Sequence, residues 1–255
     1  MSFYNLTKEQ RAAEVVSIGN ALLKDFQNKS SKNILKYFSD ADTYIRKTAY
    51  LATGKIFINH QELQPQIVKT LFQNFSNDDF KIRQTIINAA GEIGKKNFEI
   101  VEELFDKGLF DQHHSVRNAV IGSIKKMGEV NPVPVLEWAK KYLHHEDKEI
   151  RREICHGIEL RGRKHPADVL PLLKELQFDK TSRVSKTLVH VLGQIAYKKG
   201  CLEIVVEDLK TWENRDLVVK AIDEIIDVHE RYKDFAAMTQ EEAIAFIDRS
   251  GINNK

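Results

Sequence analysis

Residues 76–93 read SNDDFKIRQTIINAAGEI, and residues 110–127 read FDQHHSVRNAVIGSIKKM. In both stretches short polar residues precede a β-branched residue, Ile82 or Val116, which an arginine follows directly. Further apolar residues stand four and eight positions after the β-branched residue, a spacing that places them on one face of a helix. Ile82 and Val116 are 34 residues apart, which suggests a structural repeat.

The same pattern occurs six times along the chain. Its β-branched anchors are Ile45, Ile82, Val116, Ile150, Val184 and Val218. Consecutive anchors are 37 residues apart once and 34 residues apart four times. Five positions before the anchors stand mostly short polar residues suited to a turn or a helix cap, namely Asp40, Asn77, Asp111, His145, Asp179 and Glu213. A second apolar stretch precedes each pattern, so each repeat is predicted to be a helical hairpin.

The repeat predicts an all-α fold, a right-handed α-solenoid of about six helical hairpins over residues 31–234. We expect residues 1–255 to form a single solenoid domain. TKEQ at 7–10 and TQEE at 239–242 have the pattern of a capping box. They predict an N-terminal capping helix within residues 1–30 and a C-terminal one within 235–255, with Gly251 as its end.

The repeated segment, about residues 30–232, resembles HEAT-like repeats, in which an Asp before the second helix is followed by a Val/Ile–Arg pair. The period is shorter than the roughly 40 residues of HEAT units and equals that of tetratricopeptide units. The Trp-Leu-Gly-Tyr pattern of the latter is absent, which favours the HEAT interpretation. The resemblance implies that second helices line a concave face, where equivalent positions of successive repeats form columns.

Composition limits the class of protein. The chain is 42% hydrophobic and 30% charged, as expected of a folded protein. It has no apolar run of the roughly 18 residues that a membrane span needs, and its N-terminus lacks an export pattern. Its two cysteines, Cys155 and Cys201, form no CxxC motif. We therefore expect a cytoplasmic protein that has no membrane association, cofactor or metal; the adjacent histidines at 113–114 and 144–145 fall in predicted turns.

Charge is distributed unevenly along the chain. Residues 151–200 contain eleven Lys/Arg and five Asp/Glu, whereas residues 201–255 contain seven and thirteen. Basic surfaces attract phosphate backbones. The basic segment is therefore the place to look for a nucleic-acid-binding surface.

Two columns near the anchors are rich in basic residues. Directly after the anchors stand Arg46, Arg83, Arg117 and Arg151. These arginines either bind phosphates or pair with a loop Asp of their own or the next repeat, and the pairing is favoured because it is usual in HEAT-like proteins. One position further on stand Lys47, Gln84, Asn118, Arg152, Lys186 and Lys220, four bases and no acid.

Repeats four and five are predicted to combine bases, imidazoles and an aromatic ring on one face. His156 and His190 both stand six positions after their anchors, and Arg163 and Tyr197 both stand thirteen after. Nucleic-acid surfaces use such cations for phosphates and aromatic rings for bases. The candidate nucleic-acid-binding residues are Lys47, Arg152, His156, Arg161, Arg163, Lys186, His190 and Tyr197.

Residues 135–166 and 169–196 resemble the C-terminal repeats of the HEAT-like DNA alkylation-repair family. The first match rests on Ile150, Arg151, Arg152 and Gly157, with Arg161 and Arg163 in place of the arginines of the family's Arg-Pro-Arg segment. The second match rests on Leu172, Leu173, Asp179, Val184, Val189, Leu192 and Ile195. The resemblance implies DNA binding and, for the family's alkylpurine DNA glycosylases, excision of alkylated purines.

That reaction needs a carboxylate to stabilise its cationic transition state. Where the family motif has Glu this chain has His156, and the flanking acids are Glu153 and Glu159. If the chain is an enzyme, one of these two must act instead. Three hypotheses follow: a HEAT-like protein that binds DNA or another polyanion without catalysis, which we favour; an active alkylpurine DNA glycosylase; and a protein–protein interaction scaffold.

Overall fold

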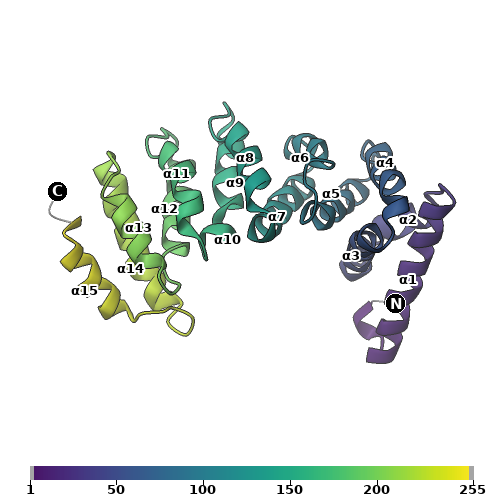
Figure 1. Cartoon of the computed structure of the whole chain (residues 1–255), viewed down its shortest axis with the longest axis horizontal. Helices are drawn as coiled ribbons and strands as arrows, with labels where there is room; N and C mark the ends of the chain where they lie inside the picture. Colours follow the sequence, from purple (N-terminus) through teal and green to yellow (C-terminus); the bar gives the residue numbers. More distant parts are fainter. Residues whose placement is uncertain (1–2, 253–255) are drawn as a thin grey trace. The chain divides into compact units, whose positions relative to one another are not determined.

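The computed structural model describes residues 3–252, and every regular element in this range is helical. Contacts within the chain divide it into two compact units, residues 1–131 and residues 132–255 (Figure 1). No helix among the described residues combines the length and apolar character that crossing a membrane requires. The division into two units does not test the single domain predicted for residues 1–255, which stays a prediction.

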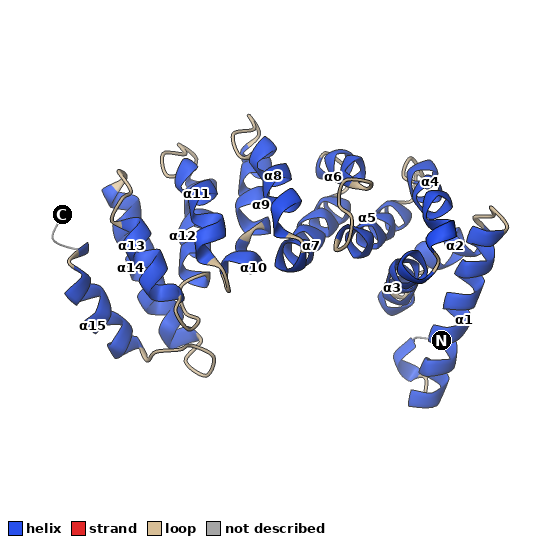
Figure 2. Cartoon of the chain, viewed as in Figure 1, coloured by secondary structure: helices blue, strands red, loops and turns tan. Residues whose placement is uncertain are grey.

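The first unit contains three stacked hairpins and a long N-terminal helix that packs beside the first of them (Figure 2). Its elements are η1 (Phe3–Asn5), α1 (Lys8–Gln27), α2 (Lys32–Phe38), α3 (Thr43–Asn59), η2 (Gln61–Leu63), α4 (Gln64–Asn74), α5 (Phe80–Gly94), α6 (Glu102–Leu109) and α7 (His114–Val130). The second helices pack in series, α3 on α5 and α5 on α7, and α1 covers α3. The hairpins thus share one continuous apolar interior within this unit.

The second unit repeats the arrangement. Its elements are α8 (Pro132–Tyr142), α9 (Lys148–Gly157), α10 (Glu159–Gly162), α11 (Pro166–Glu175), α12 (Ser182–Gln194), α13 (Cys201–Leu209), α14 (Arg215–Arg231) and α15 (Gln240–Ser250). Helix α12 packs between α9 and α14, α11 packs on α13, and α15 packs on both α13 and α14. Each unit therefore contains three stacked helical hairpins within residues 3–252, and the prediction of an all-α, HEAT-like repeat fold is confirmed.

Four of the six second helices, α3, α5, α7 and α9, begin with a two-step turn. In the second repeat the Asn77 side chain accepts a hydrogen bond from the Asp79 N–H at 3.0 Å, and the Asp79 side chain accepts one from the Lys81 N–H at 2.9 Å. The residue five positions before the anchor is thus a turn residue, and the N-cap lies two residues later. The same pair of bonds is made by Asp40 and Asp42, by Asp111 and His113, and by His145 and Asp147.

The arginine column fixes these turns. Arg83 Nη1 donates to the carbonyl oxygens of Asn77 and Asp78, at 2.7 and 3.0 Å. Arg46, Arg117 and Arg151 make the equivalent bonds to their own loops. These contacts favour a structural role for the arginines over phosphate binding, because each guanidinium donates hydrogen bonds to carbonyl oxygens of the loop that precedes its helix.

The predicted helix ends at both termini are confirmed. Thr7 and Gln10 form a capping box at the start of α1, and Thr239 and Glu242 form one at the start of α15. Gly251 ends α15 with φ 72°, a left-handed conformation in which glycine carries no steric penalty.

Candidate binding surface

Several basic residues of the second unit line two hollows between its second helices. One hollow between α9 and α12 is lined by Arg152, His156, Arg183, Lys186, Thr187 and His190. A neighbouring hollow between α12 and α14 shares Lys186 and His190 and adds Ser182, Ser185, Val189, Lys220, Glu224 and Arg231. We call the six side chains Arg152, His156, Arg183, Lys186, His190 and Lys220 the basic surface.

Helix periodicity explains why these side chains share a face. Arg183, Lys186 and His190 stand at positions i, i+3 and i+7 of α12, which lie along one stripe of a helix. Arg152 and His156 occupy the equivalent stripe of α9, four residues apart. Because α9 and α12 pack side by side, the two stripes face a common hollow.

The cations of the basic surface differ in their partners. Arg152 lies 3.0 Å from Glu149 and 3.3 Å from Glu153, and Arg183 lies 3.1 Å from the same Glu149. Lys186 and Lys220 are exposed, and within residues 3–252 neither is found in an ion pair. The two lysines therefore contribute the charge that is most available to an anionic ligand.

A buried polar cluster of Glu159, Arg163 and Gln194 lies next to His156. Glu159 accepts a hydrogen bond from Arg163 Nη2 at 2.6 Å and lies 3.1 Å from His156 Nε2. Arg163 also donates to Gln194 Oε1 at 2.7 Å. The cluster links α10 to α12 and holds the Glu159 carboxylate in place.

Three of the predicted site residues lie elsewhere. Tyr197 is only 4% exposed and stacks on Tyr232 with 5.3 Å between ring centroids, so in this conformation its face is not available to a nucleobase. Arg161 pairs with Asp168 of α11, a first helix of the next hairpin. Lys47 belongs to the first unit, where it lines a hollow between α3 and α5.

The two acids proposed for a glycosylase are both buried. Glu153 is 7% exposed beside Arg152, and Glu159 is 2% exposed between Arg163 and His156. Neither carboxylate is among the groups that line the two hollows of the basic surface. Of the residues that line these hollows the acidic one is Glu224, in the hollow between α12 and α14. A cationic sugar-like transition state in the hollow between α9 and α12 would therefore face positive side chains.

Arg183 and Glu224 line the two hollows but were not among the site residues predicted from the sequence. Arg183 could have been found because it stands three residues before Lys186 and seven before His190 on the same helix. Glu224 stands six positions after its anchor, in the same column as His156 and His190. Its Oε1 atom lies 3.6 Å from His190 Nδ1.

The cysteines are structural. Cys155 is fully buried, and burial together with the nearby Glu159 raises the pKa of its thiol far above the ordinary value. Burial also raises the pKa of Cys201. A thiol with a raised pKa is a poor nucleophile.

Comparison with known proteins leaves the family open. No family model matches the chain, and no curated protein matches it. Solved structures similar to it include smu.31 of Streptococcus mutans UA159, at 18% identity over 81% of this chain and 97% of that one, with a TM-score of 0.45. A HEAT-like repeats protein of the archaeon Thermococcus onnurineus NA1 has 15% identity, 84% and 93% coverage, and a TM-score of 0.40. A designed armadillo repeat protein for modular peptide recognition has 16% identity, 75% and 95% coverage, and a TM-score of 0.32.

The hairpins, the two-step turns and the arginine column define this chain as a HEAT-like helical-repeat protein. Its second unit carries a cationic surface on the second helices. These features describe a helical-repeat protein with an exposed cationic surface.

Proposed function

We propose that the protein is a non-catalytic HEAT-like repeat scaffold that binds the phosphate backbone of DNA on the basic surface. The observation that carries the proposal is the hollow between α9 and α12, whose lining contains Arg152, Arg183 and Lys186 with two histidines and no acidic residue. Cations on the exposed face of a groove bind DNA by releasing counterions from the phosphates.

The absence of catalysis is part of the proposal. The support for it is the burial of Glu153 and Glu159 and their pairing with arginines, since a glycosylase needs a carboxylate that faces the sugar. Incubation of the protein with DNA that contains alkylated purines should release no free base. Release of alkylated purines above the background rate would show that the chain is an enzyme.

The binding test uses the full chain, a fluorescent DNA duplex and fluorescence anisotropy. If three or four phosphates are contacted, each doubling of salt should weaken binding roughly 6- to 12-fold. The double variant Lys186→Glu/Lys220→Glu should weaken binding more than tenfold, because it places two negative charges on the basic surface.

The matched control is Lys140→Glu/Lys199→Glu. It makes the same change in net charge within the second unit but replaces lysines of the first helix α8 and of the loop before α13. Circular dichroism should show that both variants are folded. Equal DNA affinity of the two variants would contradict the assignment of the site.

A further inference from the structure

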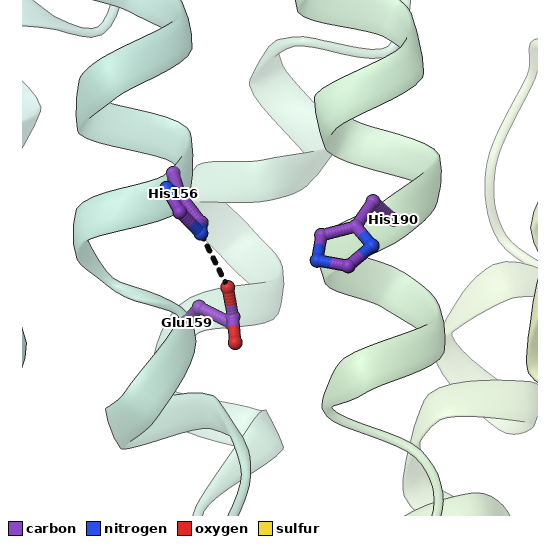
Figure 3. A group of neighbouring side chains, drawn as sticks. All are labelled: His156, Glu159 and His190. Atoms are coloured by element: carbon purple, nitrogen blue, oxygen red, sulfur yellow. Dashed lines mark ion pairs between the residues drawn. The ribbon is translucent and has the colours of Figure 1, made fainter. Parts of the chain in front are cut away.

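Three side chains with metal-ligating atoms converge at the edge of the basic surface. His156 lies one residue before the end of α9, Glu159 begins α10, and His190 lies on α12 (Figure 3). One ligand atom from each lies within 4.8 Å of the others, and among the described residues this is the group of three or more such side chains that could hold a metal ion. No metal was predicted from the sequence, because the adjacent histidine pairs fall in turns.

The repeat register and the spacing along the chain together create this cluster. His156 and His190 occupy the same position of consecutive repeats, and their ring centroids are 6.3 Å apart. Glu159 stands three residues after His156, across the junction of α9 and α10 at Ile158, and its carboxylate lies 3.1 Å from His156 Nε2. Figure 3 shows the His190 ring facing this pair from the neighbouring helix.

Two of the three side chains, His190 and Glu159, lie close to a further charged residue. Glu224 lies 3.6 Å from His190 Nδ1, which leaves Nε2 as the nitrogen available to a metal. Arg163 donates to Glu159 Oε1, and the other oxygen, Oε2, faces His156. The hydrogen bond from Arg163 fixes the direction of the Glu159 carboxylate, and the nearby Glu224 carboxylate favours a proton on His190 Nδ1.

Burial places the cluster at the boundary between protein and solvent. The Glu159 side chain is 3% exposed, whereas those of His156 and His190 are 38% and 43% exposed. A metal held by the three would rest on a buried carboxylate and keep its remaining coordination position open to the hollow. Two imidazoles, one carboxylate and an open position form a donor set that zinc uses.

We propose that His156 Nε2, Glu159 Oε2 and His190 Nε2 form a three-ligand site for a divalent transition metal of the zinc class. Imidazole ligands select zinc and its neighbours over Mg²⁺ and Ca²⁺, which take oxygen ligands. The proposal is independent of DNA binding, because it rests on ligand geometry rather than on the charge of the surface.

Neighbouring positive charges disfavour the binding of a metal cation at this site. Lys186 and Arg152 line the same hollow, and the Arg163 guanidinium contacts Glu159. Glu159 is paired with Arg163 and Glu224 is paired with Arg231, so these carboxylates offset the two arginines and leave the charges of Lys186 and Arg152. The alternative is that His156 and Glu159 form an ordinary ion pair and hold no metal, and a titration decides between the two.

The test uses the full-length, metal-free chain at pH 7.5. Calorimetry measures its titration with zinc, and absorption spectroscopy measures its titration with Co²⁺, whose spectrum reports tetrahedral coordination. We expect one metal per chain. His190→Ala should weaken binding at least 100-fold without unfolding the chain, because this side chain is largely exposed. Glu224→Gln should weaken metal binding about 10- to 100-fold, the usual effect of losing a residue that contacts a metal ligand without binding the metal itself.

The matched control is His144→Ala. His144 Nε2 lies 2.8 Å from Glu175, an exposed His–Glu pair outside the three-residue cluster. Its loss should leave affinity and stoichiometry unchanged. The proposal is overturned if the unsubstituted chain takes up no metal, or if His190→Ala binds as tightly as the unsubstituted chain.

Discussion

Arg83 and Asp111 join consecutive repeats through two parallel hydrogen bonds, from Nε at 2.7 Å and from Nη2 at 2.9 Å. Both side chains are nearly buried, at 8% and 7% exposure. Arg151 and Asp179 form the same bridge in the second unit. Since Arg83 also binds carbonyls of its own loop, one guanidinium fixes two successive loops relative to each other.

The first prediction concerns the energy of this bridge. Arg83→Ala should lower the free energy of unfolding by about 3–5 kcal/mol, because it leaves the Asp111 carboxylate buried without its cation. The control is Arg46→Ala, since the hydrogen bonds described for Arg46 go only to backbone carbonyls. That variant should lose about 1–2 kcal/mol. Urea denaturation measures both, and equal losses would contradict a special contribution from the carboxylate.

The second prediction concerns acid stability. Burial alone would raise the pKa of Asp111, but hydrogen bonds from Arg83 and the His113 N–H outweigh it and lower that pKa. Asp179 has a lowered pKa for the same reasons, with Arg151 and Thr181 as donors. A carboxyl group whose pKa is lower in the folded state stabilises the protein above its unfolded pKa of about 3.9, and this contribution disappears as the pH falls through the folded value.

The variant Asp111→Asn tests the sign of this effect. Its stability deficit relative to the unsubstituted chain should be largest near pH 6 and should shrink steadily below pH of about 4. Denaturation curves at a series of pH values between 7 and 3 measure the deficit. A deficit that stays constant over this range would show that Asp111 is not stabilised in its charged form.

The repeat register was the most predictable part of this protein, and its limits coincide with helix ends. Arg152, His156, Lys186 and His190 lie within α9 and α12, where the helical period holds, and they share one hollow as their columns predict. Tyr197 stands three residues after the end of α12. There the backbone has left the helical period, so a column position no longer determines where a side chain points.

Ion-pair partners were less predictable than positions. The sequence left two roles open for residues such as Asp111, a turn or a cap, because short polar side chains serve in both. The structure makes Asp111 a turn residue and His113 the cap. The contact of Glu159 with His156 joins residues three apart, a spacing at which side chains meet along a helix, whereas the bond from Arg163 to Gln194 joins residues 31 apart and no local pattern indicates it.

The third prediction uses two glycines of the first unit that lie inside helices. A Cβ added to Gly91 of α5 would lie 2.6 Å from Ser123 Oγ and 2.7 Å from Ser123 Cβ, on the neighbouring helix α7. Gly91→Ala should therefore cost about 1–3 kcal/mol. At Gly122 of α7 a Cβ would meet no atom within 4 Å, so Gly122→Ala should stabilise the chain by about 0.5–1 kcal/mol. Thermal unfolding of the two variants should shift in opposite directions.

The last prediction separates the buried aromatic ring from the exposed cation. Tyr197 is buried against Tyr232, so Tyr197→Ala should lower the free energy of unfolding by about 3–5 kcal/mol, as other large-to-small changes in a core do. Lys186→Ala should change it by less than about 0.5 kcal/mol, because its side chain is exposed. The effects on DNA affinity should be the reverse: Lys186→Ala weakens binding severalfold, and folded Tyr197→Ala binds as the unsubstituted chain does. Weakened DNA binding by Tyr197→Ala at a temperature where it is fully folded would mean that this ring reaches the nucleic acid after all.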